Sequence, residues 1–277
     1  MLTKKTIGFL GAGNMAEALI KGLLASKRVS AAQITACDKS AERLVHLAEK
    51  YEIKLFNKNF EAAKNSDIIF ITVKPGDVSS VLKDIAPELT PEKLVISVAA
   101  GVTTGAIAAA LRSSGFARQV PVIRAMPNTP ATVAAGITAV FADVNASDSD
   151  VKLATAVFES VGSVITVEDE ELMNAVTGLS GSGPAYVFLF MEALCEAGEK
   201  LGIGREAAKT LAIQTTLGAA RLALDGSVSL HDLIKKVSSP GGTTIEGLKK
   251  LDESGFKDAV IKAVEAAAKR AKELSKQ

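Results

Sequence analysis

The sequence is poor in the residues that metal sites, nucleic-acid surfaces and membrane spans require. It has no tryptophan and only two tyrosines, so aromatic platforms on which nucleobases could stack are not expected. Its 32 basic and 31 acidic residues are interspersed and give a formal net charge of +1. A balance of this kind predicts neither a nucleic-acid partner nor electrostatic attraction to a membrane surface.

Cysteine and histidine are equally scarce. Cys37 and Cys195 stand far apart in apolar contexts, which is typical of core thiols in a reducing compartment. His46 and His231 are also widely separated, and no H-E-x-x-H or Cys-x-x-Cys spacing occurs. We therefore expect no metal ion, and the lack of a G-x-S-x-G elbow after a strand argues against a hydrolase.

No segment predicts membrane insertion or export. The longest apolar run, Ala185 to Leu194, contains Glu192 and is shorter than the ~20 residues of a membrane span. The opening Met-Leu-Thr-Lys-Lys leads at once into a strand-like run, which leaves no room for a signal peptide. We expect a soluble, cytoplasmic protein with no membrane partner.

The chain does contain two contrasting regimes, and its 277 residues can fill two moderate domains. In residues 1–167, short β-rich apolar runs alternate with helical patterns, which predicts a parallel sheet covered by helices on both faces. The expected strands are Thr6–Leu10, Ile34–Cys37, Ile68–Val73, Leu94–Ala99, Val120–Arg124, Ile137–Phe141 and Val164–Val167.

Residues 168–277 predict a second, all-helical domain. The stretch Ala185 to Leu194 is apolar on almost every side, as a buried helix is. Because so apolar a helical domain can complete its core with another copy, we expect a homo-oligomer built from dimers through this domain. The expected helices are Leu172–Leu179, Pro184–Gly198, Arg205–Leu224, His231–Val237, Thr244–Leu251 and Phe256–Leu274.

A glycine-rich turn, Gly11-Ala12-Gly13-Asn14-Met15-Ala16, directly follows the first expected strand. It fits the G-x-G-x-x-G/A pattern of a doubly wound, Rossmann-type dinucleotide-binding domain. In that pattern the first glycine makes the turn, the second admits a pyrophosphate, and the last small residue lets helix approach strand. The position of the turn in the first strand-helix unit supports a dinucleotide site here.

The end of the second expected strand leaves the choice of dinucleotide open. Asp38 could bind the ribose hydroxyls of NAD, whereas Lys39, Ser40 and Arg43 could hold the 2′-phosphate of NADP. Ser40 could equally do no more than cap the helix that follows. NADPH and NADH are both compatible with these residues.

A second glycine-rich turn, Ser238-Ser239-Pro240-Gly241-Gly242-Thr243-Thr244, precedes an amphipathic run. Its glycines allow close approach of a ligand to the backbone, and Thr243 with Glu246 fits a capping box at a helix start. Free N–H groups and the helix dipole would then stabilise a carboxylate or phosphate. The alternative is a well-capped surface helix without a ligand.

Several stretches together resemble one family. They are Gly8–Ala16, Val73–Pro75, Ala99–Gly101, Arg124–Pro130, Ala175–Tyr186 and Val237–Thr244. In sequence and in order they resemble the pyrroline-5-carboxylate reductases, which complete proline biosynthesis, and the resemblance covers essentially the whole chain. It implies a Rossmann-type domain followed by a helical dimerisation domain, and hydride transfer from NAD(P)H to the C=N carbon of 1-pyrroline-5-carboxylate, giving L-proline.

The resemblance also implies roles for individual residues. Thr244 is expected as the catalytic side chain that hydrogen-bonds the substrate, with Thr243 as a backbone donor. Because neither hydroxyl is a strong acid, positioning is a better account of catalysis than proton transfer from a tuned side chain. The expected substrate-binding residues are Val237, Ser239, Gly241, Gly242, Thr243 and Thr244.

The coenzyme is expected along the ends of the strands. Lys74 could also be only a solvated loop residue, and Asn128 could be a turn former instead of a nicotinamide neighbour. The expected coenzyme-binding residues are Leu10, Gly11, Ala12, Gly13, Asn14, Met15, Asp38, Lys39, Ser40, Asn59, Val73, Lys74, Pro75, Val98, Ala99, Ala100 and Asn128.

The chain departs from the family pattern in two places. The stretch Asp225-Gly226-Ser227-Val228 lacks the Glu-x-Pro pattern that is usual in the family. Lys235 and Lys236 stand where the family usually carries an acid-amide pair, which bears on contacts at the amine side of the substrate. Two other interpretations are a 3-hydroxyacid dehydrogenase and a non-catalytic dinucleotide sensor. The first generally needs a lysine in the segment Thr177 to Tyr186, which has none.

Overall fold

The computed structural model describes residues 2–116 and 118–275, which form two compact units. Unit 1 comprises Met1–Gly181 with Ala266–Gln277, and unit 2 comprises Ser182–Glu265. This division differs from the predicted boundary after residue 167. The physical reason is that residues 168–181 bind the sheet domain, since Glu170 accepts hydrogen bonds from Thr104 and Ser180 accepts one from Asn128.

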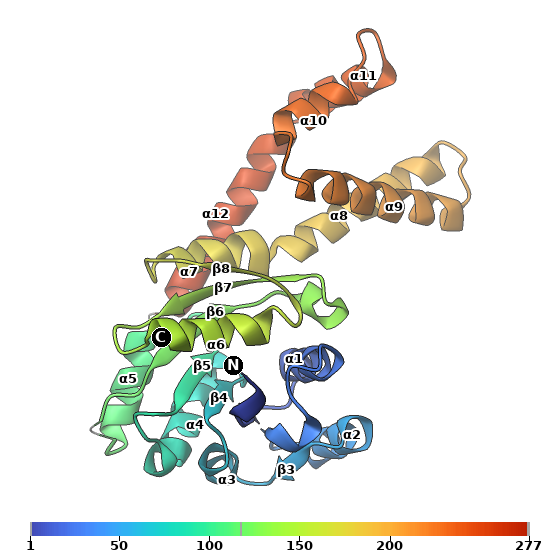
Figure 1. Cartoon of the computed structure of the whole chain (residues 1–277). Coiled ribbons are helices and arrows are strands. Elements are labelled where there is room, and N and C mark those ends of the chain that lie inside the picture. Colours follow the sequence, from blue (N-terminus) through green and yellow to red (C-terminus); the bar gives the residue numbers. More distant parts are fainter. Residues whose placement is uncertain (1, 117, 276–277) are drawn as a thin grey trace. The chain divides into compact units, whose positions relative to one another are not determined.

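Unit 1 is built on one sheet with the strand order β3-β2-β1-β4-β5-β6-β7-β8 among the described residues (Figure 1). All neighbouring strands are parallel except β6 and β7. The strands are β1 Ile7–Leu10, β2 Ile34–Cys37, β3 Lys54–Phe56, β4 Ile68–Ile71, β5 Leu94–Ser97, β6 Val122–Met126, β7 Gly136–Ala142 and β8 Gly162–Thr166.

Two features of the sheet differ from the expectation. The β6–β7 pair is antiparallel, because residues 127–135 are too few for the crossover that a parallel pair requires. The strand β3 was not predicted, because three residues at the sheet edge produce no apolar run. The remaining expected strands are present with ends shifted by a few residues.

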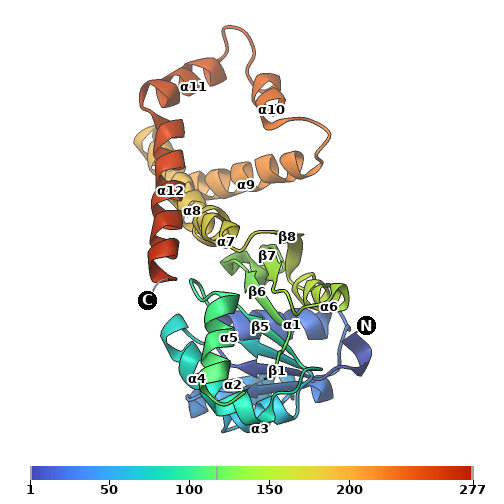
Figure 2. The ribbon, with the colours of Figure 1, turned by 90° about the vertical axis from the view of Figure 1, so that its left-hand side faces the viewer.

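Helices cover both faces of the sheet, as predicted (Figure 2). Successive strand residues point to opposite faces, so Phe9 packs into one apolar cluster and Leu10 into the other. The first face is covered by α1 (Asn14–Ala25), α2 (Ala41–Tyr51) and α6 (Asp148–Phe158), and the second by α3 (Asn59–Lys64), α4 (Val78–Ile85) and α5 (Thr104–Ser113).

Three phenylalanines form the centre of the first apolar layer. Phe9 stacks on Phe70 with ring centroids 5.0 Å apart, and Phe158 meets Phe70 edge-on at 5.8 Å. All three side chains are fully buried. Each contributes about 1.5–3 kcal/mol through its removal from water, so this layer fixes α6 against the strands.

Unit 1 continues past the sheet into α7 (Leu172–Val176) and a π-helical turn, Thr177–Gly181. The sequence predicted a single helix over Leu172–Leu179, and the structure instead widens its last turn. Such π-turns interrupt regular helices and are frequent at functional sites.

Unit 2 consists of helices only. Gly198 of α8 lies so close to α9 that an added Cβ would stand 3.0 Å from the Cβ of Ala208. The helices are α8 Gly183–Lys200, α9 Arg205–Leu224, α10 Leu230–Lys236, α11 Thr243–Glu253 and the first part of α12 Phe256–Leu274.

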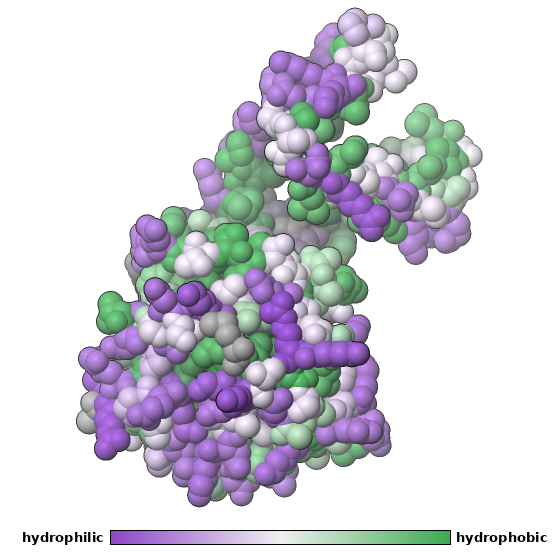
Figure 3. Space-filling model, viewed as in Figure 1, coloured by the Kyte–Doolittle hydropathy of each residue, from purple (hydrophilic) through white to green (hydrophobic). Residues whose placement is uncertain are grey.

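The expectation that α8 is buried is wrong for the single chain. Within the described residues α8 has no buried position, and Phe188 and Leu189 are 62% and 65% exposed. The helices of unit 2 do not form an enclosing second layer around α8, and Figure 3 shows apolar surface on them. The apolar sides of α8 are therefore available to another protein surface.

No helix in the described part of the chain combines the length and apolarity that crossing a bilayer requires.

Candidate coenzyme and substrate sites

The residues predicted to bind the coenzyme come together at one edge of the sheet of unit 1. They follow the carboxyl ends of β1, β2, β4, β5 and β6, or lie at the start of α3 after β3. The direction of winding reverses between β1 and β4, and ligands of doubly wound sheets bind at this switch point. The predicted substrate residues belong to unit 2, where they form the loop between α10 and α11 and the start of α11.

Gly11 makes the turn between β1 and α1, and no other residue fits there. Its φ is +99°, and an added Cβ would stand 2.8 Å from the carbonyl group of Thr72. The Gly11 N–H donates to the Cys37 carbonyl at 2.8 Å, and the Thr72 hydroxyl donates to the Gly11 carbonyl at 2.6 Å. The ends of β1, β2 and β4 are thereby joined.

Gly13 leaves the start of α1 open. It is the N-cap residue, and no side chain among the described residues caps it. Apart from Gly13 itself and its two chain neighbours, no described residue has an atom within 4 Å of where its Cβ would be. The N–H groups of the first turn and the helix dipole favour an anion at this position. Leu10, Ala12 and Ala16 are fully buried, so the turn can offer its backbone to a pyrophosphate.

Asp38 is bound to the glycine-rich turn itself. Its carboxylate accepts a hydrogen bond from Ala12 N at 2.6 Å and another from Ser40 N at 2.8 Å. The Ser40 hydroxyl accepts from Arg43 N at 3.2 Å, so Ser40 caps the helix α2, which is one of the alternatives that the sequence left open. Lys39 is exposed and pairs with Asp77 at 2.9 Å.

Arg43 belongs to a charged cluster that supports the turn. Its guanidinium donates to the Ala12 carbonyl at 2.5 Å and to Glu17. Glu17 also accepts from Lys50, His46 and Tyr51. Burial raises the pKa of Glu17, but hydrogen bonds from Lys50, Arg43, His46 and Tyr51 outweigh it and lower the pKa to about 2. The half-buried side chain of Arg43 is thus committed to the turn. Lys39, whose pair with Asp77 is exposed, and Ser40 are left as candidates for a 2′-phosphate.

The other predicted coenzyme-binding residues lie along the same edge, and their side chains differ in solvent exposure. Asn59 donates to Asp84 at 3.0 Å, and Lys74 is exposed just before Pro75. Ala99 is buried, so only its backbone is offered to a ligand, whereas Val98 and Ala100 are half-buried.

Asn128 serves the loop after β6. Its amide nitrogen donates to the Ser180 carbonyl at 3.1 Å, and its amide oxygen accepts from Ile137 N at 3.0 Å. Both ends of the carboxamide are therefore engaged within unit 1. The turn-forming alternative accounts for this side chain, and its role toward nicotinamide stays a prediction.

A cavity of about 520 Å³ borders this edge of unit 1. Pro75 and Ala100 line it together with residues of α4 and α5, and Leu274 and Ser275 form another wall. Gly101, whose φ is +78°, packs against the same end of α12, with an added Cβ only 3.2 Å from Leu274. The last turns of α12 therefore contribute to the surroundings of the loop after β5.

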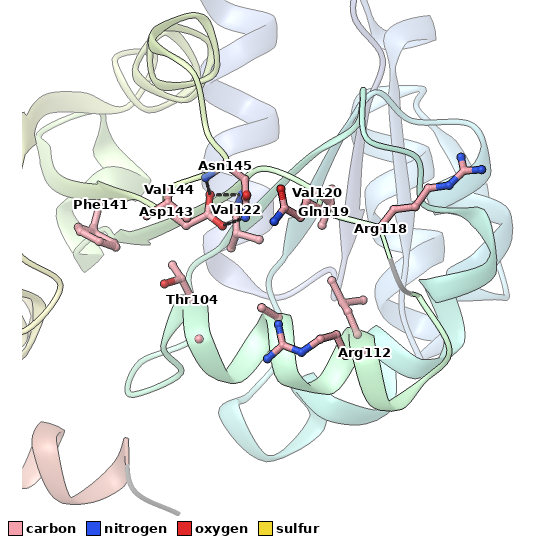
Figure 4. A pocket seen from close by; sticks show the side chains of 13 residues that line it. Thr104, Arg112, Arg118, Gln119, Val120, Val122, Phe141, Asp143, Val144 and Asn145 are labelled. Atoms are coloured by element: carbon pink, nitrogen blue, oxygen red, sulfur yellow. Dashed lines mark hydrogen bonds between the residues drawn. The ribbon is translucent and has the colours of Figure 1, made fainter.

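A second cavity, of about 430 Å³, lies between α5 and the end of β7 (Figure 4). None of the predicted site residues lines it. Asp143 in its wall accepts hydrogen bonds from Val122 N and from the side chain of Asn145. These contacts account for the carboxylate as a loop support.

The glycine-rich turn of unit 2 presents an open helix start. Gly241 has a φ of +71°, and the Gly242 N–H donates to the Ser239 carbonyl at 2.9 Å. Gly242 is the N-cap of α11, and within the described residues no side chain caps it. Thr244 is half-buried, whereas Val237, Ser239 and Thr243 are exposed.

The predicted capping box of Thr243 and Glu246 is wrong. The helix begins one residue earlier than the box requires, so Thr243 occupies the first helical position and Gly242 the cap. A residue inside the first turn cannot direct its hydroxyl to the N–H groups as a cap does. The start of α11 is consequently left free for an external anion.

One cluster was not predicted from the sequence. The carboxylate of Glu170 accepts from Thr104 N at 2.8 Å, from Thr104 Oγ1 at 2.9 Å and from Arg124 at 3.2 Å. Arg124 is only 3% exposed. The sequence signal for this cluster is an arginine inside the apolar strand Val122–Met126, because a buried guanidinium needs a charged partner.

In the described ranges, no three or more His, Cys, Asp or Glu side chains gather as a metal site would require.

The fold and the open glycine turn after β1 define a Rossmann-type, NAD(P)H-dependent oxidoreductase. Residues 6–101 match a family profile described as NADP oxidoreductase coenzyme F420-dependent. Residues 170–274 match the profile described as pyrroline-5-carboxylate reductase dimerisation, which indicates that the chain assembles as a dimer or larger oligomer.

Full-length relatives agree with these profiles. The chain is 42% identical over 271 residues to the pyrroline-5-carboxylate reductase of Pseudomonas aeruginosa, covering 98% of this chain and 97% of the relative. A solved pyrroline-5-carboxylate reductase from Coxiella burnetii superposes with a TM-score of 0.92 at 40% identity, covering 99% of this chain and 100% of that one. The Plasmodium falciparum pyrroline carboxylate reductase, solved with NADP bound, gives 0.86 at 32% identity, with 98% of each chain covered.

The chain therefore belongs to the pyrroline-5-carboxylate reductase family. This membership confirms the resemblance stated from the sequence, and it sets aside the 3-hydroxyacid dehydrogenase interpretation.

Proposed function

We propose that this chain reduces 1-pyrroline-5-carboxylate to L-proline with NADPH, as the last step of proline biosynthesis. The observation that carries the site assignment is the pair of open helix starts, at Gly13 in unit 1 and at Gly242 in unit 2. Each suits one anionic group of the reactants, a pyrophosphate and a carboxylate. The names of the full-length relatives supply the chemistry.

In the proposal, the coenzyme lies along the sheet edge of unit 1. The turn from Leu10 to Met15 holds the pyrophosphate with backbone N–H groups, and Asn59, Val73–Pro75 and Val98–Ala100 line the remainder. Lys39 and Ser40 hold the 2′-phosphate, since Arg43 is engaged by Ala12 and Glu17. The NADP bound to the Plasmodium relative supports this choice, and NADH is the weaker alternative.

The turn of unit 2 holds the substrate. Backbone N–H groups from Gly242 to Thr244 bind the carboxylate, Val237, Ser239 and Gly241 shape the turn, and the Thr244 hydroxyl orients the imine nitrogen. Bound NADPH supplies the hydride that reduces the C=N bond. Because a protonated imine is already electrophilic, the protein contributes mainly orientation, and the amine product takes its last proton from water.

The assembly is part of the proposal. Two copies pair through the apolar helices of unit 2, whose exposed side chains need a second layer. The protein acts in the cytoplasm, where the free thiols Cys37 and Cys195 would stay reduced.

Coenzyme oxidation tests the reaction directly. Loss of NADPH absorbance on addition of pyrroline-5-carboxylate to the purified protein is expected, with slower loss of NADH. A 3-hydroxyacid with NADP and the corresponding oxo acid with NADPH are the negative controls. Coenzyme binding without turnover of the imine would instead support the dinucleotide-sensor interpretation.

The role of Thr244 is tested against its neighbour. Thr244→Ala should lower kcat/KM for the imine by about tenfold to a hundredfold, the range expected for one lost hydrogen bond to a charged or reacting group. Thr243→Ala, one residue away and exposed, should change kcat/KM by less than about threefold. Equal effects of the two substitutions would contradict the assignment.

A further inference from the structure

The loop after β5 leads into α5, whose start is hydrogen-bonded to a carboxylate from a distant segment of the chain. Residues 98–100 are proposed to line the coenzyme, and α5 begins four residues later, at Thr104. Glu170 binds both the N–H and the hydroxyl of Thr104, at 2.8 and 2.9 Å. The N-cap Thr103 also accepts a hydrogen bond from Ala106 N at 3.1 Å. The first turn of α5 is thus closed by Thr103 and Glu170 together, whereas the first turn of α1 is open.

Arg124 holds Glu170 in place. Its guanidinium lies 3.2 Å from the Glu170 carboxylate, and it is itself almost completely buried in β6. A buried guanidinium needs a charged partner, and a carboxylate that also receives two donors from Thr104 has little freedom to move. One cluster of three side chains therefore links β6, the segment before α7 and the start of α5: Arg124, Glu170 and Thr104.

We propose that Glu170 is a positioning residue for the nicotinamide half of the coenzyme, an inference that rests on the proposed function. By fixing the start of α5, Glu170 sets the backbone of residues 98–101 at the end of β5. Asp38 and Asn59 lie on the other side of the switch point and are proposed to bind the adenosine half. Asp38 is hydrogen-bonded to Ala12, and Asn59 to Asp84. Glu170 and the Thr103 cap together occupy the helix start that an anion would otherwise enter.

The proposal separates the two halves of the coenzyme experimentally. Glu170→Gln should raise the Kd of NADPH about tenfold, the scale of one charge-assisted hydrogen bond. The Kd of 2′,5′-ADP, which contains only the adenosine half, should stay within about twofold, the scatter expected for a distant site. Since the protein has no tryptophan, the fluorescence of NADPH itself can report binding.

Two further variants serve as controls for the effect of Glu170→Gln. Glu168→Gln changes an exposed member of the same acidic run and should leave both dissociation constants unchanged. Thr104→Val removes one of the three donors but no charge, and should raise the Kd of NADPH about threefold. If Glu170→Gln does not fold, Thr104→Val decides the question.

The outcomes are distinct. Weaker binding of NADPH with unchanged binding of 2′,5′-ADP supports the proposal. Folded variants whose two dissociation constants stay unchanged, or rise together, would overturn it. If the unaltered protein binds neither nucleotide, the proposed function itself fails, independently of Glu170.

Discussion

Unit 1 buries its large apolar side chains within the chain, whereas unit 2 leaves most of its own exposed. Phe70 in the sheet is fully buried, and Phe188 on α8 is 62% exposed. Between residues 182 and 265, only Ala208 and Ala212 are buried hydrophobic positions. A unit with so small a core gains much of its stability from another surface. Unit 1 therefore serves nucleotide binding, whereas unit 2 serves assembly.

The polar contacts differ in the same way. Unit 1 joins distant segments through pairs such as Arg43–Glu17 and Arg124–Glu170. The pairs of unit 2 are local, for example Lys250–Glu253 within one helical turn. Long-range pairs fix the positions of elements, whereas exposed local pairs contribute little to stability. The arrangement of the elements in unit 1 is thus determined by contacts within that unit, whereas the arrangement of unit 2 depends more on the surface that covers it.

The largest effect expected is on the core of unit 1. Phe70→Ala removes a ring that packs against both Phe9 and Phe158, and should lower the free energy of unfolding by about 3–5 kcal/mol. Phe190→Ala in unit 2, a residue 38% exposed, should cost less than half as much at low protein concentration. Urea titration of both variants checks the difference, and equal losses would remove the distinction between the units.

The next effect concerns assembly. Phe188→Asp places a charge on the apolar side of α8 and should raise the dissociation constant of the oligomer at least about a hundredfold. Val144→Asp changes a residue of unit 1 that is 99% exposed, and should leave assembly as it is. Light scattering across a dilution series gives the measurement. An unchanged oligomer in Phe188→Asp would place the interface elsewhere.

A smaller effect is expected from acid. The pKa of Glu17 falls from 4.5 to about 2 in the folded state, so its stabilisation is complete above pH 4.5 and is lost as the pH drops toward 2. In Glu17→Gln, the fall in the urea midpoint between pH 5 and pH 3 should be shallower than in the unaltered protein. Glu253→Gln, at the local pair in unit 2, should leave that slope unchanged.

The smallest effect concerns the two lysines at the end of α10. Lys235 and Lys236 are exposed beside the substrate turn and add positive charge near the proposed carboxylate site. Replacing both by Gln should raise the KM for the imine about two- to fivefold and weaken its dependence on salt. The matched change of Lys249 and Lys250 on α11 should have less effect. A KM independent of all four residues would show that charge in unit 2 does not assist binding.

Most of unit 1 could be predicted because its strands and helices carry periodic apolar patterns. The glycine turn was predictable for a different reason, because Gly11 needs a positive φ and Gly13 an open face. Strand β3 was too short to show a pattern, and the antiparallel β6–β7 pair depends on the length of a loop. Local sequence patterns therefore did not predict the short edge strand or the direction of this strand pair.

The candidate site was predictable only in part. The turn around Gly242 was found, but its helix begins at a different residue from the one that a capping box would give. The buried Arg124 could have been suspected from its apolar neighbours, yet nothing local distinguishes Glu170 from the acidic residues beside it. Contacts between residues 46 positions apart are set by the packing of the whole unit.

The return of the chain to unit 1 through residues 266–275 also bears on how the protein is made. During synthesis, all strands of the sheet and the glycine-rich turn of unit 2 leave the ribosome before the end of α12 does. The loop at Gly101 gains its neighbours Leu274 and Ser275 only then. At about 5–20 residues per second, the roughly 110 residues between the end of β8 and Ser275 take on the order of 10 s to synthesise. During this time the loop after β5 lacks the wall that the end of α12 later provides.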